Sequence, residues 1–256
     1  MLAVEQIVSV QGKARWVDGV SFAVPQAKTI ALFDPWPRSR AAMIEVLAGQ
    51  RRVSSGTIRL HDIDITRLGA SARLRLGVVR SFQPKIEAAE RTIFAHVAAS
   101  LSLRSGGDLA GLLATETDRR QSDEVSTILA KTGLSELADH PPTGLPQNYS
   151  IQLELARCLA LRPRLLILDR PSAGLSAPDR QRLIAYLNAL GQDGVALIVV
   201  EEDVNLIAAL TNRALIMRQG KLVADGPIET QGERSEQPWV IAGPPPERFG
   251  SWAARS

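Results

Sequence analysis

The stretch from Asp34 to Ala42 follows an apolar run and precedes apolar residues that recur at helical spacing. A tight loop between a strand and a helix can bind phosphate when its sequence is G-x-x-x-x-G-K-[ST]. In that pattern the glycines admit backbone N–H groups, and the lysine and the hydroxyl meet the phosphates and Mg²⁺. Here the four key positions hold Asp34, Ser39, Arg40 and Ala41. The place for a nucleotide is present but most of its chemistry is missing, and the simpler interpretation is a plain connecting loop.

The elements that would position this loop are predicted by hydrophobic periodicity. Predicted strands cover residues 7–10, 16–24, 29–33, 56–60, 77–82, 165–169 and 195–200, with a final hairpin at 214–217 and 221–224. Predicted helices cover residues 43–49, 150–161, 179–190 and 204–210. This alternation predicts an α/β fold whose mainly parallel sheet carries helices on both faces. The strand-poor block from about 84 to 150 predicts an inserted helical subdomain.

Length and composition are typical of a globular protein with a sizeable core: 256 residues, 45% hydrophobic and 22% charged. A net charge of +3, without a basic stripe interleaved with aromatic residues, argues against a nucleic-acid partner. The single cysteine, Cys158, lies in an apolar helical stretch and is predicted to be a core residue of a protein from a reducing compartment. His61, His96 and His140 lack the spacing of metal ligands.

The first residues lack the basic and apolar regions of a signal peptide, and the longest apolar runs fall far short of the ~20 residues that span a bilayer. We therefore expect a cytoplasmic protein, unless a partner holds it at the inner face of a membrane. Residues 232–256 are rich in Pro, Arg, Glu and Ser, and are predicted to extend from a domain that spans residues 1–231. Trp239 and Trp252 in this extension pack either on the domain or on a partner.

Five separated motifs keep a characteristic order. They are the loop 34–42, Phe82-Gln83, Leu145-Pro146-Gln147-Asn148-Tyr149, the run from Leu165 to Ser176, and Glu201-Glu202-Asp203 after an apolar strand. From about residue 3 to 242 the chain thereby resembles the ATP-binding subunit of ABC transporters, and it looks most like the ATPases of branched-chain amino acid and amide importers. The resemblance implies a P-loop NTPase-type nucleotide-binding domain with an N-terminal antiparallel β subdomain and an inserted helical subdomain.

The same resemblance assigns a role to each site position. Asp169 occupies the place of the aspartate that holds Mg²⁺, and Gln83 is also unaltered. The catalytic glutamate is replaced by Arg170, a cation that cannot accept a proton. The switch histidine is replaced by Glu202, whose charge would repel a γ-phosphate.

Other family positions are altered as well. Asn148 and Tyr149 replace a Gly-Gln pair in the signature, where backbone should approach phosphate. Ser176 replaces an aspartate, and Gln11 falls where an aromatic ring would stack on adenine. In the family's geometry Arg170 and Glu202 lie near each other, so we expect a salt bridge between them, and a guanidinium and a carboxylate can form two parallel hydrogen bonds. The alternative is two independent surface charges.

Parallel loss at so many positions favours a retained fold whose hydrolysis is abandoned. The first hypothesis is a pseudo-ATPase subunit that pairs with a second ABC-type ATPase-like chain, as a homodimer or heterodimer, beside membrane permease subunits. In the second, the fold serves as a scaffold or regulatory subunit in a soluble enzyme complex. The third is an ATPase that remains active with unusual residues. ATP and Mg²⁺ would bind weakly if at all, and Asp169 would be the metal ligand.

Overall fold

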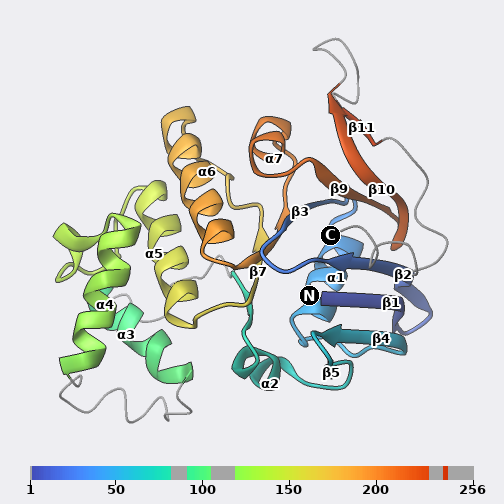
Figure 1. Ribbon diagram of the computed structural model, residues 1–256, viewed down its shortest axis with the longest axis horizontal. Coiled ribbons are helices and arrows are strands. Elements are labelled where there is room, and N and C mark those ends of the chain that lie inside the picture. The colour runs from blue at the N-terminus through green and yellow to red at the C-terminus, as the bar shows by residue number, and fades with distance from the viewer. Residues whose placement is uncertain (1, 82–90, 105–118, 231–238, 242–256) are drawn as a thin grey trace.

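The computed structural model describes residues 2–81, 91–104, 119–230 and 239–241. Its strands are β1 (Leu2–Gln11), β2 (Ala14–Val24), β3 (Thr29–Phe33), β4 (Ser55–Leu60), β5 (Ile63–Asp64), β6 (Val78–Arg80), β7 (Leu165–Asp169), β8 (Ala196–Val200), β9 (Arg213–Arg218), β10 (Lys221–Thr230) and β11 (Trp239–Ile241). Its helices are α1 (Pro37–Leu47), α2 (Ala70–Arg75), α3 (Ile93–Arg104), α4 (Arg119–Thr132), the 3₁₀ turn η2 (Ser135–Leu137), α5 (Gln147–Ala160), α6 (Ala177–Gln192) and α7 (Val204–Leu210). Figure 1 shows strands and helices alternating along the chain, which confirms the predicted α/β class.

A seven-stranded sheet in the order β11-β10-β9-β3-β8-β7-β6 forms the centre of the molecule. The strands from β9 to β6 run parallel, and β10 and β11 continue the sheet in antiparallel pairing. Every residue of β8 is buried, as a continuous apolar run predicts for a strand covered on both faces. Because β3, β8 and β7 are parallel neighbours, their carboxyl ends meet at one edge of the sheet.

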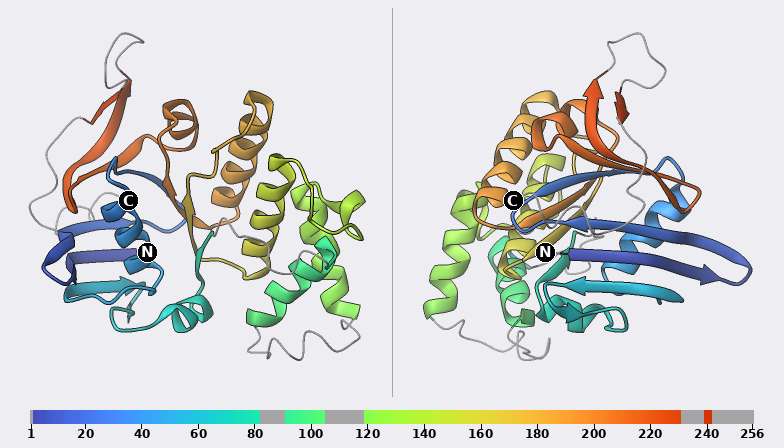
Figure 2. Two further views of the ribbon diagram at one scale, coloured as in Figure 1. Left: turned by 180° about the vertical axis from the view of Figure 1, so that it is seen from behind. Right: turned by 45° about the vertical axis from the view of Figure 1, so that its right-hand side comes forward.

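A second, antiparallel sheet has the order β2-β1-β4-β5 and corresponds to the predicted N-terminal subdomain. Helix α1 packs between the two sheets, where Met43, Ile44 and Leu47 join a core that includes residues of β1, β2, β3 and β7. A separate core lies under α5, α6 and α7, against the other side chains of β7 and β8. Figure 2 shows these layers from two further directions. The strand β3 and the helix α1 are thus both held by buried packing, which fixes the loop between them.

The helical block contains α3, α4 and η2, which pack with α5 in a core of their own. Cys158 on α5 is buried, as predicted, and burial raises the pKa of its thiol. None of the helices in the described ranges combines the length and the hydropathy that crossing a bilayer requires. In the same ranges, no three His, Cys, Asp or Glu side chains are placed to bind a metal ion.

The structure differs from the sequence prediction at several elements. Helix α1 begins at Pro37 rather than near Met43, so Ser39, Arg40 and Ala41 lie in the helix and not in the loop before it. Strand β5 was not predicted. Helix α5 begins at Gln147 rather than near Ser150, so part of the predicted loop motif lies in its first turn. Helix α2 was not predicted, since its sequence, ASARLR, has no apolar periodicity. Strand β11 lies inside the segment predicted as an exposed extension and pairs with β10. The rest of that segment, including Trp252, is outside the described residues.

Candidate functional site

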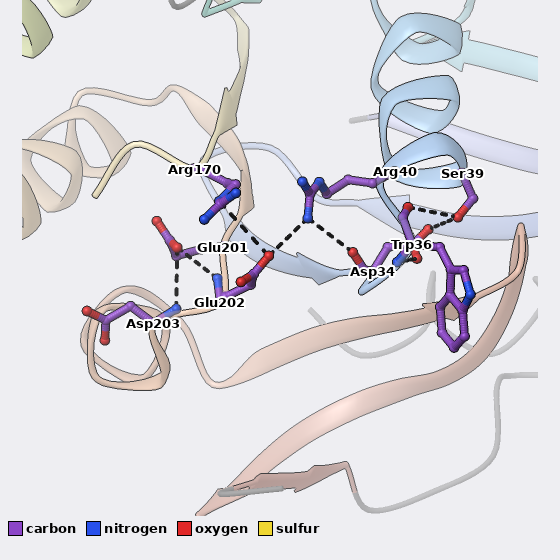
Figure 3. A network of polar contacts seen from close by, with 8 residues as sticks. All are labelled: Asp34, Trp36, Ser39, Arg40, Arg170, Glu201, Glu202 and Asp203. Atoms are coloured by element: carbon purple, nitrogen blue, oxygen red, sulfur yellow. Dashed lines mark hydrogen bonds and ion pairs between the residues drawn. The ribbon is translucent and has the colours of Figure 1, made fainter. Parts of the chain in front are cut away.

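Three neighbouring strands bring the predicted site residues to one edge of the sheet. Asp34 follows β3, Asp169 ends β7 and Glu202 follows β8. The pairings of β3 with β8 and of β8 with β7 place these strand ends side by side. Figure 3 shows the resulting cluster, in which Arg40 and Arg170 both approach Glu202. Of the residues that the sequence singled out, those at the ends of β3, β7 and β8 are therefore brought to one place, together with Arg40 from α1.

The loop before α1 is closed by its own carboxylate. The side chain of Asp34 is buried, with 1% exposure, and its Oδ1 accepts a hydrogen bond from the Trp36 N–H at 2.9 Å. Its Oδ2 accepts one from Ser39 Oγ at 2.6 Å. Burial raises the pKa of Asp34, while these hydrogen bonds and the charge of Arg40 oppose the rise. Donors that a phosphate-binding loop would offer to a ligand are here used within the chain.

Pro37 also has a structural explanation in this loop. It is the first residue of α1, where a fixed φ suits the helix and the missing N–H costs no helical hydrogen bond. Trp36 precedes it in an extended conformation, with φ −92° and ψ 109°. The loop is therefore a short extended connection that enters the helix directly, stabilised by the bonds from Trp36 and Ser39 to Asp34.

Arg40 reaches across the site. Its Nη1 lies 3.0 Å from Glu202 Oε1 and donates to the carbonyl oxygen of Asp34 at 3.4 Å. The Nε of Arg170 lies 4.0 Å from the same Glu202 oxygen. The predicted contact between Arg170 and Glu202 is thus present, but through one atom pair at the limit of an ion pair, and it is not bidentate. Arg40, which lies at the shorter distance from Glu202, was not predicted as its partner. The position of Arg40 in the phosphate-loop pattern nevertheless places it beside the same site.

Glu201, to which the sequence analysis gave no role, hydrogen-bonds to two of the loops. It is buried, and its Oε2 accepts hydrogen bonds from the backbone N–H and the hydroxyl of Ser172, at 3.1 and 2.7 Å. Its Oε1 accepts from the N–H groups of Glu202 and Asp203, at 2.7 and 3.3 Å. The carboxylate thereby ties the loop after β7 to the loop after β8, which sets the positions of Arg170 and Glu202. A glutamate directly after an apolar strand was the available signal.

The positions that would hold Mg²⁺ and a triphosphate fit that ligand poorly. Asp169 keeps its carboxylate, whose Oδ2 lies 3.7 Å from Arg80 Nη2. Ala41 offers no hydroxyl, Asp34 takes up hydrogen-bond donors of the loop, and Glu202 is paired with Arg40. A metal-bound triphosphate requires such donors and an available positive charge. Gln83, the other unaltered position, is outside the described residues.

The signature positions Leu145, Pro146, Gln147, Asn148 and Tyr149 run into the first turn of α5. Leu145 and Tyr149 pack against the helical core, so their side chains have a structural role. Asn148 lines a cleft between α5 and α6. Within the described part of the chain, none of the five makes a polar side-chain contact with the cluster around Asp34.

Two further altered positions are occupied by local contacts. Gln11, at the end of β1, accepts a hydrogen bond from Arg51 Nη1 at 3.0 Å through its Oε1. Ser176 caps the start of α6, where its hydroxyl oxygen accepts from the Asp179 N–H at 3.3 Å. Both side chains are therefore engaged in contacts within the chain.

Comparison with known proteins gives one consistent result. A family model described as "ABC transporter" matches residues 17–173. The chain is 28% identical over 236 residues to LivG of Salmonella typhimurium, a "high-affinity branched-chain amino acid transport ATP-binding protein", with 90% of this chain and 92% of that protein covered. It is 29% identical to BraF of Pseudomonas aeruginosa, which carries the same description, over 83% of this chain and 86% of that protein.

Solved structures give the same fold. A nucleotide-free ATP-binding cassette from an ABC transporter superposes with a TM-score of 0.81 at 21% identity, covering 89% of this chain and 91% of that one. The cbiO1 protein of Clostridium perfringens, described as part of the ABC transporter complex cbiONQ, superposes with a TM-score of 0.74 at 19% identity, covering 88% of each chain. At these identities the likeness concerns the fold alone.

Proposed function

The chain belongs to the ABC transporter family, and from that membership we propose that it is an ATP-binding-type subunit that has lost ATP hydrolysis. It resembles amino acid importer ATPases over most of its length. In this proposal it acts as a structural or regulatory partner of an active subunit, and its own nucleotide site is permanently filled by side chains.

The observation that carries the proposal is the closed loop. The Trp36 N–H and the Ser39 hydroxyl donate to the buried Asp34, so these two donors of the loop are already used within the chain. Arg40, which would have to turn toward phosphate, is instead paired with Glu202 at 3.0 Å. A triphosphate would have to displace the Asp34 carboxylate from the donors of the loop and compete with Glu202 for Arg40.

The residue at the position of the catalytic base supports the same proposal. Hydrolysis requires a group that orients water and takes part of its proton, and such a group must lie beside the reacting phosphate. Arg170 occupies that place with a cation that has no acceptor atom. Glu202 is a carboxylate, but its Oε1 is engaged by Arg40 and Arg170. Asp169 alone offers no complete catalytic set.

The partners are proposed from the relatives. LivG and BraF are described as transport ATP-binding proteins, and cbiO1 is described as part of a transporter complex. One solved relative, a bacterial ABC transporter cassette, is described as dimeric. We therefore propose pairing with a second ABC-type subunit, at a membrane permease of the amino acid importer class and on its cytoplasmic side.

The first test measures hydrolysis and Mg-ATP binding by the purified full-length chain. We expect no phosphate release above the buffer blank, and no difference between the wild type and the Asp169→Asn variant. Phosphate release that Asp169→Asn abolishes would overturn the proposal, because it would show an active site that uses the predicted Mg²⁺ ligand. Calorimetry with Mg-ATP reports binding separately from turnover.

A rebuilt loop provides the matched positive control. The substitutions Asp34→Gly, Ser39→Gly, Arg40→Lys and Ala41→Thr restore the phosphate-binding pattern and remove the internal carboxylate. We expect them to raise Mg-ATP affinity by at least about tenfold, since the loop donors become available. The single variant Arg170→Glu leaves the loop closed and the pair of Arg40 with Glu202 in place, and should not raise the affinity. Equal affinities in the wild type and the rebuilt loop would contradict a loop closed by Asp34.

A scaffold subunit of a soluble complex is the second candidate, and the closed loop supports it equally. The two candidates differ in the partner proteins with which the chain associates. Co-purification of the tagged full-length chain from detergent-solubilised membranes with a permease supports the transporter subunit. Recovery with a soluble enzyme, and no permease, supports the scaffold.

A further inference from the structure

The cleft between α5 and α6 has a volume of about 200 Å³, and residues at the end of α4 also line it. Figure 1 shows α5 between the other two helices. The apolar part of the wall consists of Ile151 and Leu155 on α5, Leu175 in the loop after β7, and Leu183 on α6. An apolar cavity of about 150 Å³ can hold benzene, so this cleft has room for a molecule with a single ring. None of the eight residues of Figure 3 lines the cleft, so it is separate from the closed loop.

Two residues of the wall carry a buried polar atom that lacks a hydrogen-bond partner in the described part of the chain. They are Gln152 on α5, through its Oε1, and Tyr186 on α6, through its hydroxyl oxygen. Burial raises the pKa of Tyr186, so its hydroxyl keeps the proton at neutral pH and can donate it. Buried polar groups are normally paired, because an unpaired one destabilises the fold. Two of them in the wall of one cleft therefore indicate hydrogen bonds to a molecule that is not part of the chain.

The charged side chains that line the cleft are paired with one another or with a neighbour. The Nη1 of Arg182 lies 3.0 Å from Asp179 Oδ1, and the Nζ of Lys131 lies 3.6 Å from Asp193 Oδ2. The side chains of Arg182 and Lys131 are 68% and 60% exposed, so their charges face solvent rather than the interior. An ionised ligand would lose hydration in the cleft without gaining an unpaired counter-ion. The charges therefore favour a neutral ligand.

We propose that the cleft binds a small neutral molecule with a single ring and one hydroxyl group, with the ring against the apolar wall and the hydroxyl at Gln152 and Tyr186. A hydroxyl both donates and accepts, so one such group can pair with an amide and with a phenol. Both polar atoms are buried in the wall, so binding includes a small rotation of each side chain toward the ligand.

This site goes beyond the proposed function and does not depend on it. Its walls come from α4 and α5 of the helical block and from α6, which covers the parallel sheet. A bound molecule would therefore bridge these two parts of the protein. The alternative occupant is water alone, and the test separates the two.

The test is calorimetry on the full-length protein with p-cresol, toluene and p-toluate, which share one methylated ring and differ in the polar group. We expect saturable binding of p-cresol. Toluene should bind about tenfold more weakly because it makes no hydrogen bond, and p-toluate about tenfold more weakly because its carboxylate loses hydration. No saturable binding of p-cresol would mean that the cleft holds water alone and would overturn the inference. Binding of toluene or p-toluate that equals or exceeds that of p-cresol also overturns it.

A matched pair of variants locates the binding. Gln152→Leu removes the unpaired amide and should weaken p-cresol binding about tenfold, leave toluene binding unchanged and not lower the melting temperature. Gln121→Leu makes the same change on α4, outside the lining of the cleft, and should leave p-cresol binding unchanged. Equal p-cresol affinities in the two variants overturn the inference. A lower melting temperature of Gln152→Leu also overturns it, because it assigns the amide a structural role. None of these measurements involves Mg-ATP, so their failure leaves the proposed function intact.

Discussion

Among the eight residues of Figure 3, Glu201 accepts the most hydrogen bonds through its side chain, and the figure draws the two that come from Glu202 and Asp203. Two more come from Ser172, so four donors converge on its two carboxylate oxygens, at distances from 2.7 to 3.3 Å, and the side chain is buried. A buried carboxylate is stable only when its oxygens are satisfied in this way. Its neighbour Glu202 carries the same group on a side chain that is 49% exposed, with arginine partners. Adjacent glutamates thus have different physical roles.

Changing Glu201 to Gln should lower the free energy of unfolding by about 2 kcal/mol, because the amide NH₂ would face donors that lose their acceptor. Urea unfolding followed by circular dichroism measures the loss. The matched control is Glu202→Gln, which should cost less than about 1 kcal/mol, since exposed ion pairs contribute little. An equal loss in both variants would show that Glu201 does not hold the two loops together.

At the scale of elements, the end of α1 depends on a buried arginine from α2. Arg73 is fully buried, and its Nη1 donates to the carbonyl oxygens of Val46 and Leu47, at 2.6 and 2.8 Å. Its Nε and Nη2 donate to the carbonyl oxygens of Leu68 and Thr66. Burial lowers the pKa of Arg73 to about 10, so it stays charged at neutral pH. A cation is well placed at a helix C-terminus, where the helix dipole is negative.

Replacing Arg73 by Met should destabilise the fold by about 3 kcal/mol, because several carbonyl oxygens would be left without donors. The control, Arg75→Met, alters an exposed residue of the same helix and should change stability by less than about 0.5 kcal/mol. Thermal unfolding of both variants and of the wild type gives the three melting temperatures to be compared. Similar melting temperatures for the two variants would mean that the carbonyl groups find other donors.

Sequence reasoning succeeded for elements whose residues carry strong periodicity. The runs that form β7 and β8 are continuous and apolar, so their buried, parallel character was predictable. Helix α2 and strand β5 are too short to show a period, and they depend on contacts such as those of Arg73. The start of α5 was missed because Pro146 and Gln147 indicate a turn as readily as a helix start.

The whole molecule contains a junction between the helical block and the parallel sheet. Glu154 on α5 lines a groove there, together with residues of α2, α3 and β6. Burial raises the pKa of Glu154 to about 7, and nearby Asp169 adds to the rise, while Arg157 and Ser81 oppose it. The folded protein therefore holds a proton at Glu154 over a range of pH in which the unfolded chain has released it.

This proton makes stability depend on pH. Between the ordinary value of 4.5 and about 7, the folded state binds more protons than the unfolded state, so the free energy of unfolding falls as the pH rises through this window. The fall attributable to Glu154 is on the order of 3 kcal/mol. Urea unfolding from pH 4.5 to 8 should show it in the wild type and not in Glu154→Gln. Glu136→Gln, an exposed change on η2, should keep the wild-type slope, and a slope that also persists in Glu154→Gln would assign it to other groups.

The site was predictable in location more than in arrangement. Parallel strands that end in Asp34, Asp169 and Glu202 had to bring these residues to one edge, so their proximity followed from topology. The order of partners did not follow, because Arg40 and Arg170 compete for one oxygen and side-chain reach decides between them. The bond from Ser39 to Asp34 was also not foreseen, since the sequence indicates lost glycines and not what replaces their function.

The carboxylate of Asp34 is covalently tethered to the loop that it fills. The effective concentration of a tethered group is set by chain geometry, so it does not vary with the growth state of a cell. Free nucleotide, in contrast, changes in both amount and phosphorylation when energy supply falls. A loop held by its own side chain keeps one conformation through such changes, because a ligand can shift only an equilibrium between states that it binds differently. In an assembly with a subunit that hydrolyses ATP, this chain would present a surface whose conformation does not change with the concentration of ATP.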